Sequence, residues 1–168
     1  DEKYADYKGK RPKIDDELVS QLKRSRDVFE AFDIPIYDNP GFEADDIIGT
    51  IAEIAKKEKN LKVVIASGDM DTMQLVDDDR VLVYTLKKGI NDTILYDEPA
   101  VRERFGFAPE VLADYKGLRG DPSDNIIGVP GIGEKTATEL VGKFGSVEDI
   151  YKKLKKNRTA FLKAGIKE

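Results

Sequence analysis

A nearly continuous apolar run at 61–67 constrains the fold more than any other stretch. Its centre, Val63-Val64-Ile65-Ala66, is apolar and rich in β-branched residues. Such a run is typical of a strand covered on both faces of a parallel sheet, so we predict an α/β fold. Asp69 and Asp71 follow it directly. Ligands of α/β sheets gather beyond the carboxyl ends of the strands, which favours a functional site here. Capping of the next helix, over 72–76, explains one of these aspartates equally well.

A second acidic group, Gly41-Phe42-Glu43-Ala44-Asp45-Asp46, stands at the start of an apolar helix predicted from Glu43 to about Lys57. A first helical turn accepts acids, so a well-capped surface helix and a metal site are both open interpretations. Glu43 and Asp46 share one face, whereas Asp45 points elsewhere, toward a second ion or only toward solvent. The predicted buried stripe is Ala44, Ile47, Ile48, Ile51, Ile54 and Ala55.

Histidine and cysteine are both missing from the 168 residues. Their absence makes zinc, thiolate and imidazole chemistry unlikely and leaves hydrolysis to carboxylates, which prefer hard cations such as magnesium or manganese. No run approaches the length of a membrane span, and a cytoplasmic location is the default expectation.

Charge is unevenly distributed along the chain. Residues 1–30 sum to zero, 31–130 to −9 and 131–168 to +4, which gives the net −5. An acidic middle with a basic end fits metal-dependent chemistry beside a lobe that grips phosphate. For the lysines at 152–156, a solvated helix is the simpler interpretation.

A third acidic group, Asp121 and Asp124, follows a helix whose apolar stripe is Val111, Leu112, Tyr115 and Leu118. The glycine-rich turn 128–133 and a further helix come next. Glycines before a helix let backbone amides approach a phosphate, and Lys135 adds a positive charge. A plain corner between two helices is the alternative.

The remaining elements are predicted from simpler patterns. The basic, tyrosine-containing segment 1–13 suits either an exposed, frayed terminus or nucleic-acid stacking. We expect an amphipathic helix at 18–32, strands at 34–37, 81–85 and 93–96, a hairpin-like return through Gly89, and a helix from 97 to 105 that begins with Asp97-Glu98-Pro99.

Four motifs together resemble one known family. They are Gly-Phe-Glu-Ala-Asp-Asp at 41–46, Ser-Gly-Asp-Met-Asp at 67–71, Gly-Asp-Pro-Ser-Asp-Asn at 120–125 and Gly-Val-Pro-Gly-Ile-Gly-Glu-Lys-Thr-Ala at 128–137. In identity, order and approximate spacing they resemble the 5′-nuclease domain at the front of bacterial DNA polymerase I, which is related to flap endonucleases. The resemblance implies a PIN-like α/β nuclease core over 1–105 and a helix–hairpin–helix lobe over 106–168. Ile127 departs from the family, which usually has proline there.

The resemblance also implies roles for individual residues. Two divalent ions, Mg²⁺ or Mn²⁺, are held in the family at positions matching Glu43, Asp45, Asp46, Asp69, Asp71 and Asp124, with Asp121 in the same loop ranked lower. Lys8 and Arg11 match a catalytic stretch of the arch through which single-stranded 5′ ends pass. The implied DNA-binding residues are Tyr7, Lys8, Arg11, Gly128, Gly131, Gly133, Lys135 and Thr136, and many relatives bind K⁺ at the hairpin.

By this resemblance we expect a structure-selective 5′ nuclease that hydrolyses DNA with two metal ions in replication and repair. Its expected substrate is branched or flapped DNA with 5′ ends, and we expect a monomer in the bacterial cytoplasm, at the nucleoid, with a polymerase region in the parent chain. In the family two strands with essential aspartates precede the arch, and no stretch here corresponds to them. A DNA-binding module without catalysis therefore remains an alternative. A PIN-type ribonuclease is another, because it shares the acidic core, although it does not ordinarily need the hairpin lobe.

Overall fold

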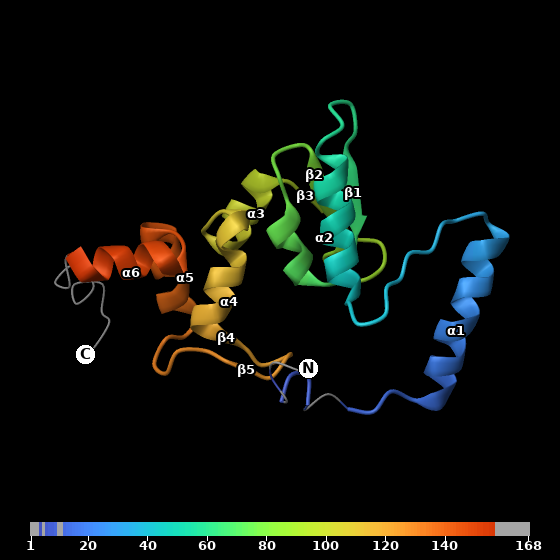
Figure 1. Ribbon diagram of the computed structural model, residues 1–168, viewed down its shortest axis with the longest axis horizontal. Helices are drawn as coiled ribbons and strands as arrows, with labels where there is room; N and C mark the ends of the chain where they lie inside the picture. The colour runs from blue at the N-terminus through green and yellow to red at the C-terminus, as the bar shows by residue number, and fades with distance from the viewer. Residues whose placement is uncertain (1–3, 5, 10–11, 157–168) are drawn as a thin grey trace.

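The computed structural model describes residues 4, 6–9 and 12–156. Helices and a small sheet form the body, and α1 lies apart from it (Figure 1). The helices are α1 (Asp16–Ala31), α2 (Ala44–Ala55), η1 (Met70–Leu75), α3 (Glu98–Phe105), η2 (Pro109–Val111), α4 (Leu112–Arg119), α5 (Glu134–Phe144) and α6 (Val147–Lys156), of which η1 and η2 are 3₁₀ helices. The strands are β1 (Val63–Ala66), β2 (Val81–Leu86), β3 (Thr93–Tyr96), β4 (Gly120–Asp121) and β5 (Ile126–Ile127). Among the described residues, no helix is long and apolar enough to cross a membrane.

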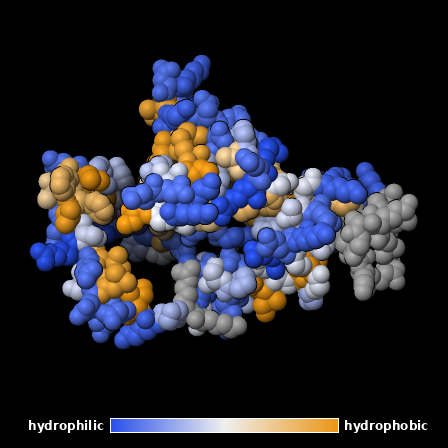
Figure 2. All heavy atoms as spheres, turned by 180° about the vertical axis from the view of Figure 1, so that it is seen from behind, coloured by the Kyte–Doolittle hydropathy of each residue, from blue (hydrophilic) through white to orange (hydrophobic). Residues whose placement is uncertain are grey.

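The main sheet has three strands in the order β1-β2-β3. β1 pairs with β2 in parallel, and β3 returns antiparallel as an edge strand, as predicted. Ile65 and Val83 are buried on one side, whereas Val64 is 53% exposed and Leu95 is 48% exposed. Seen from behind, apolar side chains gather on the surface near the top, over the sheet (Figure 2). The prediction that β1 is covered on both faces is therefore wrong for the described residues, since Val64 of β1 is exposed.

The hydrophobic core runs without a break from the sheet into the helical part. Val83 and Tyr96 of the sheet belong to the same buried cluster as Leu112 of α4 and Leu140 of α5. The helix at 98–105 is confirmed: the side chain of Asp97 caps it, proline lies in its first turn and Gly106 ends it with a φ of 81°. The stripe predicted for the next helix is also largely confirmed, since α4 buries three of its four members.

A close crossing of two glycines shapes the β4–β5 hairpin. A Cβ on Gly128 would lie 2.3 Å from the backbone nitrogen of Gly120 and 2.3 Å from the carbonyl carbon of Arg119. Only glycine fits such an approach. The crossing fixes the loop 121–125 at the end of α4.

One local prediction is confirmed and two are wrong. Helix α1 forms as predicted, although none of its described residues is buried. Residues 34–37 are not a strand. Helix α2 buries Ala52, whereas Ile51 and Ile54 are 43% and 58% exposed. Gly49 of α2 faces η1, since a Cβ there would lie 3.5 Å from the Leu75 side chain, and Ile48 packs against the core.

Candidate metal and nucleic-acid site

Asp121 is the most buried acid of the site. Only 8% of its surface is exposed, and it accepts hydrogen bonds from Lys116 Nζ at 2.7 Å and from the backbone N–H of Ser123 at 3.0 Å. The Ser123 hydroxyl donates another at 2.5 Å. Burial alone would raise the pKa of Asp121, but the hydrogen bonds from Lys116 and Ser123 outweigh it and lower the pKa to about 2. Asp121 is therefore a fixed, ionised carboxylate at neutral pH.

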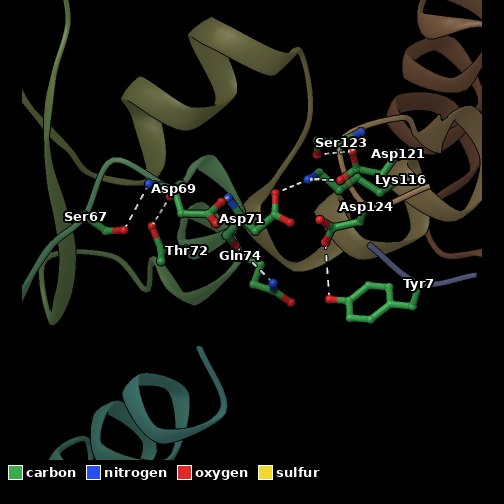
Figure 3. Close-up of polar contacts among 10 residues, drawn as sticks. All are labelled: Tyr7, Ser67, Asp69, Asp71, Thr72, Gln74, Lys116, Asp121, Ser123 and Asp124. Atoms are coloured by element: carbon green, nitrogen blue, oxygen red, sulfur yellow. Dashed lines mark hydrogen bonds and ion pairs between the residues drawn. The ribbon is translucent and has the colours of Figure 1, made fainter. Parts of the chain in front are cut away.

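Asp71 reaches this carboxylate from the sheet side of the molecule. Asp69 caps η1, because its side chain accepts a hydrogen bond from the backbone N–H of Asp71 at 2.9 Å. The sequence left open whether the pair Asp69 and Asp71 (the D-x-D) forms a functional site or caps a helix. Asp69 does cap the helix. The Asp71 side chain points across to Lys116 and the 121–125 loop (Figure 3).

Three carboxylates converge at this point. Asp71, Asp121 and Asp124 each offer one ligand oxygen, and these oxygens all lie within 4.8 Å of one another. They come from two parts of the chain about fifty residues apart. Hard divalent cations bind such groups of oxygens. Asp121, which the family resemblance ranked below the other acids, is one of these three.

The start of α2 supplies acids from the other side. Glu43 and Asp46 form a capping box, in which the Glu43 backbone N–H donates to Asp46 Oδ2 at 2.9 Å. Burial, and then the negative charges of Asp69, Asp71 and Glu43, raise the pKa of Asp45. Asp45 and Asp46 both line the cleft that Asp71 also lines, so Asp45 does not point away from the D-x-D as expected. Asp46 also caps the helix, through its Oδ2 atom.

A cleft separates α2 from η1. Its volume is about 510 Å³, and its lining includes Asp45, Asp46, Asp71 and Thr72. The acids of the two elements thus face a common, solvent-filled space. This space is where a phosphate group and its ions could enter.

The N-terminal segment joins the acidic groups. The Tyr7 hydroxyl lies 3.2 Å from Asp124 Oδ2, and Lys8 Nζ lies 2.5 Å from Glu43 Oε2. The Lys8 backbone N–H also donates to the Asp124 carbonyl at 3.0 Å. Burial would lower the pKa of Lys8, but hydrogen bonds to Glu43 and Tyr7 raise it. A frayed terminus is therefore the wrong interpretation for 6–9, while Arg11 lies outside the described residues.

The glycine-rich turn has one packed glycine and two open ones. At Gly128 the room left by the missing side chain is taken by the backbone of Arg119 and Gly120. Around Gly131, which has a φ of 82°, and around Gly133, the N-cap of α5, a Cβ would meet no atom of the described residues within 4 Å. Lys135 is exposed and Thr136 half-buried at the start of α5. The turn therefore presents backbone and one cation to a ligand.

Sequence reasoning missed two residues of the site, Lys116 and Ser123. Lys116 bridges Asp71 and Asp121, and Ser123 orients Asp121. The sequence gives one hint of the role of Lys116, its place beside the buried stripe of α4, five residues before Asp121. This spacing does not predict the contact with Asp71, which lies 45 residues away from Lys116 in the chain.

Comparison with known families assigns both parts of the chain. Residues 1–106 match the 5′-3′ exonuclease N-terminal resolvase-like domain, and residues 107–168 match the 5′-3′ exonuclease C-terminal SAM fold. The chain belongs to the 5′-3′ exonuclease family. The predicted resemblance and the α/β fold with a helical lobe are thereby confirmed.

Relatives of this exonuclease-family chain include DNA polymerase I of Bacillus caldotenax, 48% identical over 149 residues, and of Bacillus subtilis, 42% identical over 165 residues. These alignments cover 89% and 98% of the chain but 17% and 18% of those proteins. The chain thus spans about a sixth of the length of these relatives.

Two solved structures extend the comparison. The bacteriophage T5 5′-exonuclease with bound zinc ions has a TM-score of 0.75 at 25% identity, over 97% of this chain and 62% of that one. The catalytic core of Rad2 in complex with a DNA substrate has a TM-score of 0.56 at 20% identity, over 95% of this chain and 47% of that one. The Rad2 likeness concerns the fold alone.

Proposed function

We propose that this chain is the nuclease portion of a structure-selective 5′ nuclease that hydrolyses DNA phosphodiesters with the help of divalent cations. The observation that carries the proposal is the convergence of Asp71, Asp121 and Asp124, whose ligand oxygens lie within 4.8 Å of one another. Membership of the 5′-3′ exonuclease family supports the reaction class. Metal ions present in the related T5 exonuclease structure support the cofactor class.

The donor set fits magnesium or manganese. All of its members are carboxylates, and the chain has no histidine or cysteine to select a softer metal. We assign two ions to the site, held directly or through water by Glu43, Asp45, Asp46, Asp69, Asp71, Asp121 and Asp124. Bound ions of this kind supply an activated water and stabilise charge on the leaving oxygen.

The chain's own residues prepare the site for that chemistry. Ser123 holds Asp121, and the Tyr7 hydroxyl contacts Asp124 at 3.2 Å, so two ligands are oriented before an ion enters. Lys8, 2.5 Å from Glu43, remains charged at neutral pH because its pKa is raised. We assign Lys8, together with Arg11, to neutralising the scissile phosphate.

The helical lobe would bind the duplex backbone. Gly131 and Gly133 expose backbone at the N-terminus of α5, where amides and the helix dipole favour a phosphate. Lys135 and Thr136 extend this surface, and a K⁺ ion bound at the hairpin would add positive charge for a phosphate. Such contacts read shape rather than sequence, so we expect affinity to fall steeply with salt.

The decisive experiment compares substrates and metals. The 168-residue chain is incubated with a 5′-flap duplex in Mg²⁺, in Mn²⁺ and in chelator, and the products are sized. We expect ion-dependent cleavage near the flap junction that Asp71→Asn abolishes. Asp79→Asn, at an acid whose side chain is 83% exposed, is the matched control and should retain activity.

Other outcomes separate the alternatives. Binding of flapped DNA without cleavage in either metal would show that the chain is a DNA-binding module and not a nuclease. Preferential cleavage of single-stranded RNA would indicate a PIN-type ribonuclease. Unchanged cleavage by Asp71→Asn would show that the three converging carboxylates do not take part in the reaction.

The relatives suggest a wider setting. Because the chain matches about a sixth of bacterial DNA polymerase I proteins, we propose that a polymerase region accompanies it in its parent protein. We propose a monomer that acts on DNA of the bacterial nucleoid, in the cytoplasm.

A further inference from the structure

Lys116 occupies the space between two carboxylates of the candidate metal site. Its ammonium group lies 2.7 Å from Asp121 Oδ2 and also contacts Asp71 Oδ1 (Figure 3). Both acids belong to the group of three whose ligand oxygens lie within 4.8 Å of one another. The positive charge of Lys116 is therefore placed where the proposed function requires a bound cation.

We propose that Lys116 is a built-in placeholder cation, which holds Asp71 and Asp121 together in the metal-free protein and must release Asp71 before a divalent ion binds. This inference rests on the proposed function. Carboxylates this close repel one another unless a positive charge lies between them. An ion that contacts Asp71 and Asp121 would compete with the ammonium for the same oxygens and repel its charge.

The side chain has a place to go when it is released. A cavity of about 440 Å³ lies beside α4, and its lining includes Lys116 and Glu134 together with Arg104 and Arg119. Glu134 offers a carboxylate that, among the described residues, makes a long contact of 3.6 Å with Arg119. A lysine suits this exchange because its flexible stem carries a compact charge, whereas an arginine fork would stay in place through paired hydrogen bonds.

The placeholder makes a specific prediction about metal affinity. Lys116→Met keeps the length of the side chain and removes the competing charge. We expect the variant to bind Mn²⁺ about tenfold more tightly than the wild type, equivalent to about 1.4 kcal/mol. Binding is measured as the loss of the free Mn²⁺ signal in electron paramagnetic resonance titrations of the full chain, without substrate.

Lys62→Met is the matched control, because it makes the same change in net charge at a surface ion pair of 3.5 Å to Asp79. It should bind Mn²⁺ as the wild type does. If Lys116→Met binds no more tightly than the wild type, or if the control gains affinity equally, the placeholder is overturned while the proposed function stands. If neither wild type nor Lys116→Met binds Mn²⁺, both are overturned; binding by the variant alone supports the placeholder.

A second measurement does not depend on the folding of a variant. Proton–nitrogen spectra of lysine ammonium groups follow Lys116 Nζ in the wild-type chain during a Mg²⁺ titration. Release predicts a saturable shift of the Lys116 resonance and a stationary Lys62 resonance. An unmoved Lys116 resonance at saturating Mg²⁺ would show that the ion pair is structural only and overturn the inference.

Discussion

Replacing Gly128 by alanine should be among the most damaging single-methyl changes in this protein. The added Cβ would lie 2.3 Å from the Gly120 nitrogen and 2.3 Å from the Arg119 carbonyl carbon. These are backbone atoms at the crossing that fixes the 121–125 loop, so no side-chain rotation relieves the overlap. Overpacking commonly costs about 1–3 kcal/mol, and we place Gly128→Ala at or above the top of that range, about 3 kcal/mol.

Two nearby glycines separate the steric cost from other effects. Gly131→Ala meets no described atom within 4 Å but keeps a φ of 82°, which should cost about 1 kcal/mol in strain. Gly133→Ser has open space and places a favourable residue at the N-cap of α5, so its effect should be within about 0.5 kcal/mol of zero.

Urea denaturation followed by circular dichroism measures all three variants. With a slope of about 2 kcal/mol/M, Gly128→Ala should lower the midpoint by about 1.5 M and Gly131→Ala by about 0.5 M. An unfolding free energy for Gly128→Ala within 0.5 kcal/mol of the wild type would refute the reasoning. An equal loss in Gly133→Ser would likewise show that the crossing is not the cause.

Three further predictions concern stability. The pKa of Asp121, about 2, lies below its ordinary value of 3.8, so its ionised form stabilises the fold above pH 4. This contribution, up to about 2 kcal/mol, is lost as the pH falls through 2. In urea titrations repeated at each pH, Asp121→Asn should lack this part of the loss of stability in acid. Arg80 donates hydrogen bonds to two backbone carbonyls just beyond α2, at 2.9 and 2.8 Å. Arg80→Met should therefore lower the free energy of unfolding by about 1–3 kcal/mol. The control Lys62→Met should lower it by about 0.5 kcal/mol or less. Leu112→Ala, at 2% exposure, should cost about 2–5 kcal/mol, whereas Phe32→Ala, at 74%, should stay within about 0.5 kcal/mol in thermal denaturation.

The elements that the sequence predicted best are governed by near neighbours. The helix at 98–105 needs an aspartate cap, a proline in its first turn and a glycine at its end, and all three lie within the segment itself. The strand at 93–96 alternates in burial within a hairpin. The motif-bearing loops were likewise visible, because glycine and aspartate patterns are local.

Tertiary packing alone decided how the acids and cations meet. Lys116 and Asp71 are 45 residues apart, and Tyr7 and Asp124 are 117 apart. Periodicity places Asp45 on a face of α2 but does not say which neighbour that face meets. The sequence therefore determined which carboxylates could serve a metal site. Only the folded arrangement decided that the acids of α2 line one cleft with Asp71 and that Lys116 lies between Asp71 and Asp121, since these charges interact through space rather than along the chain.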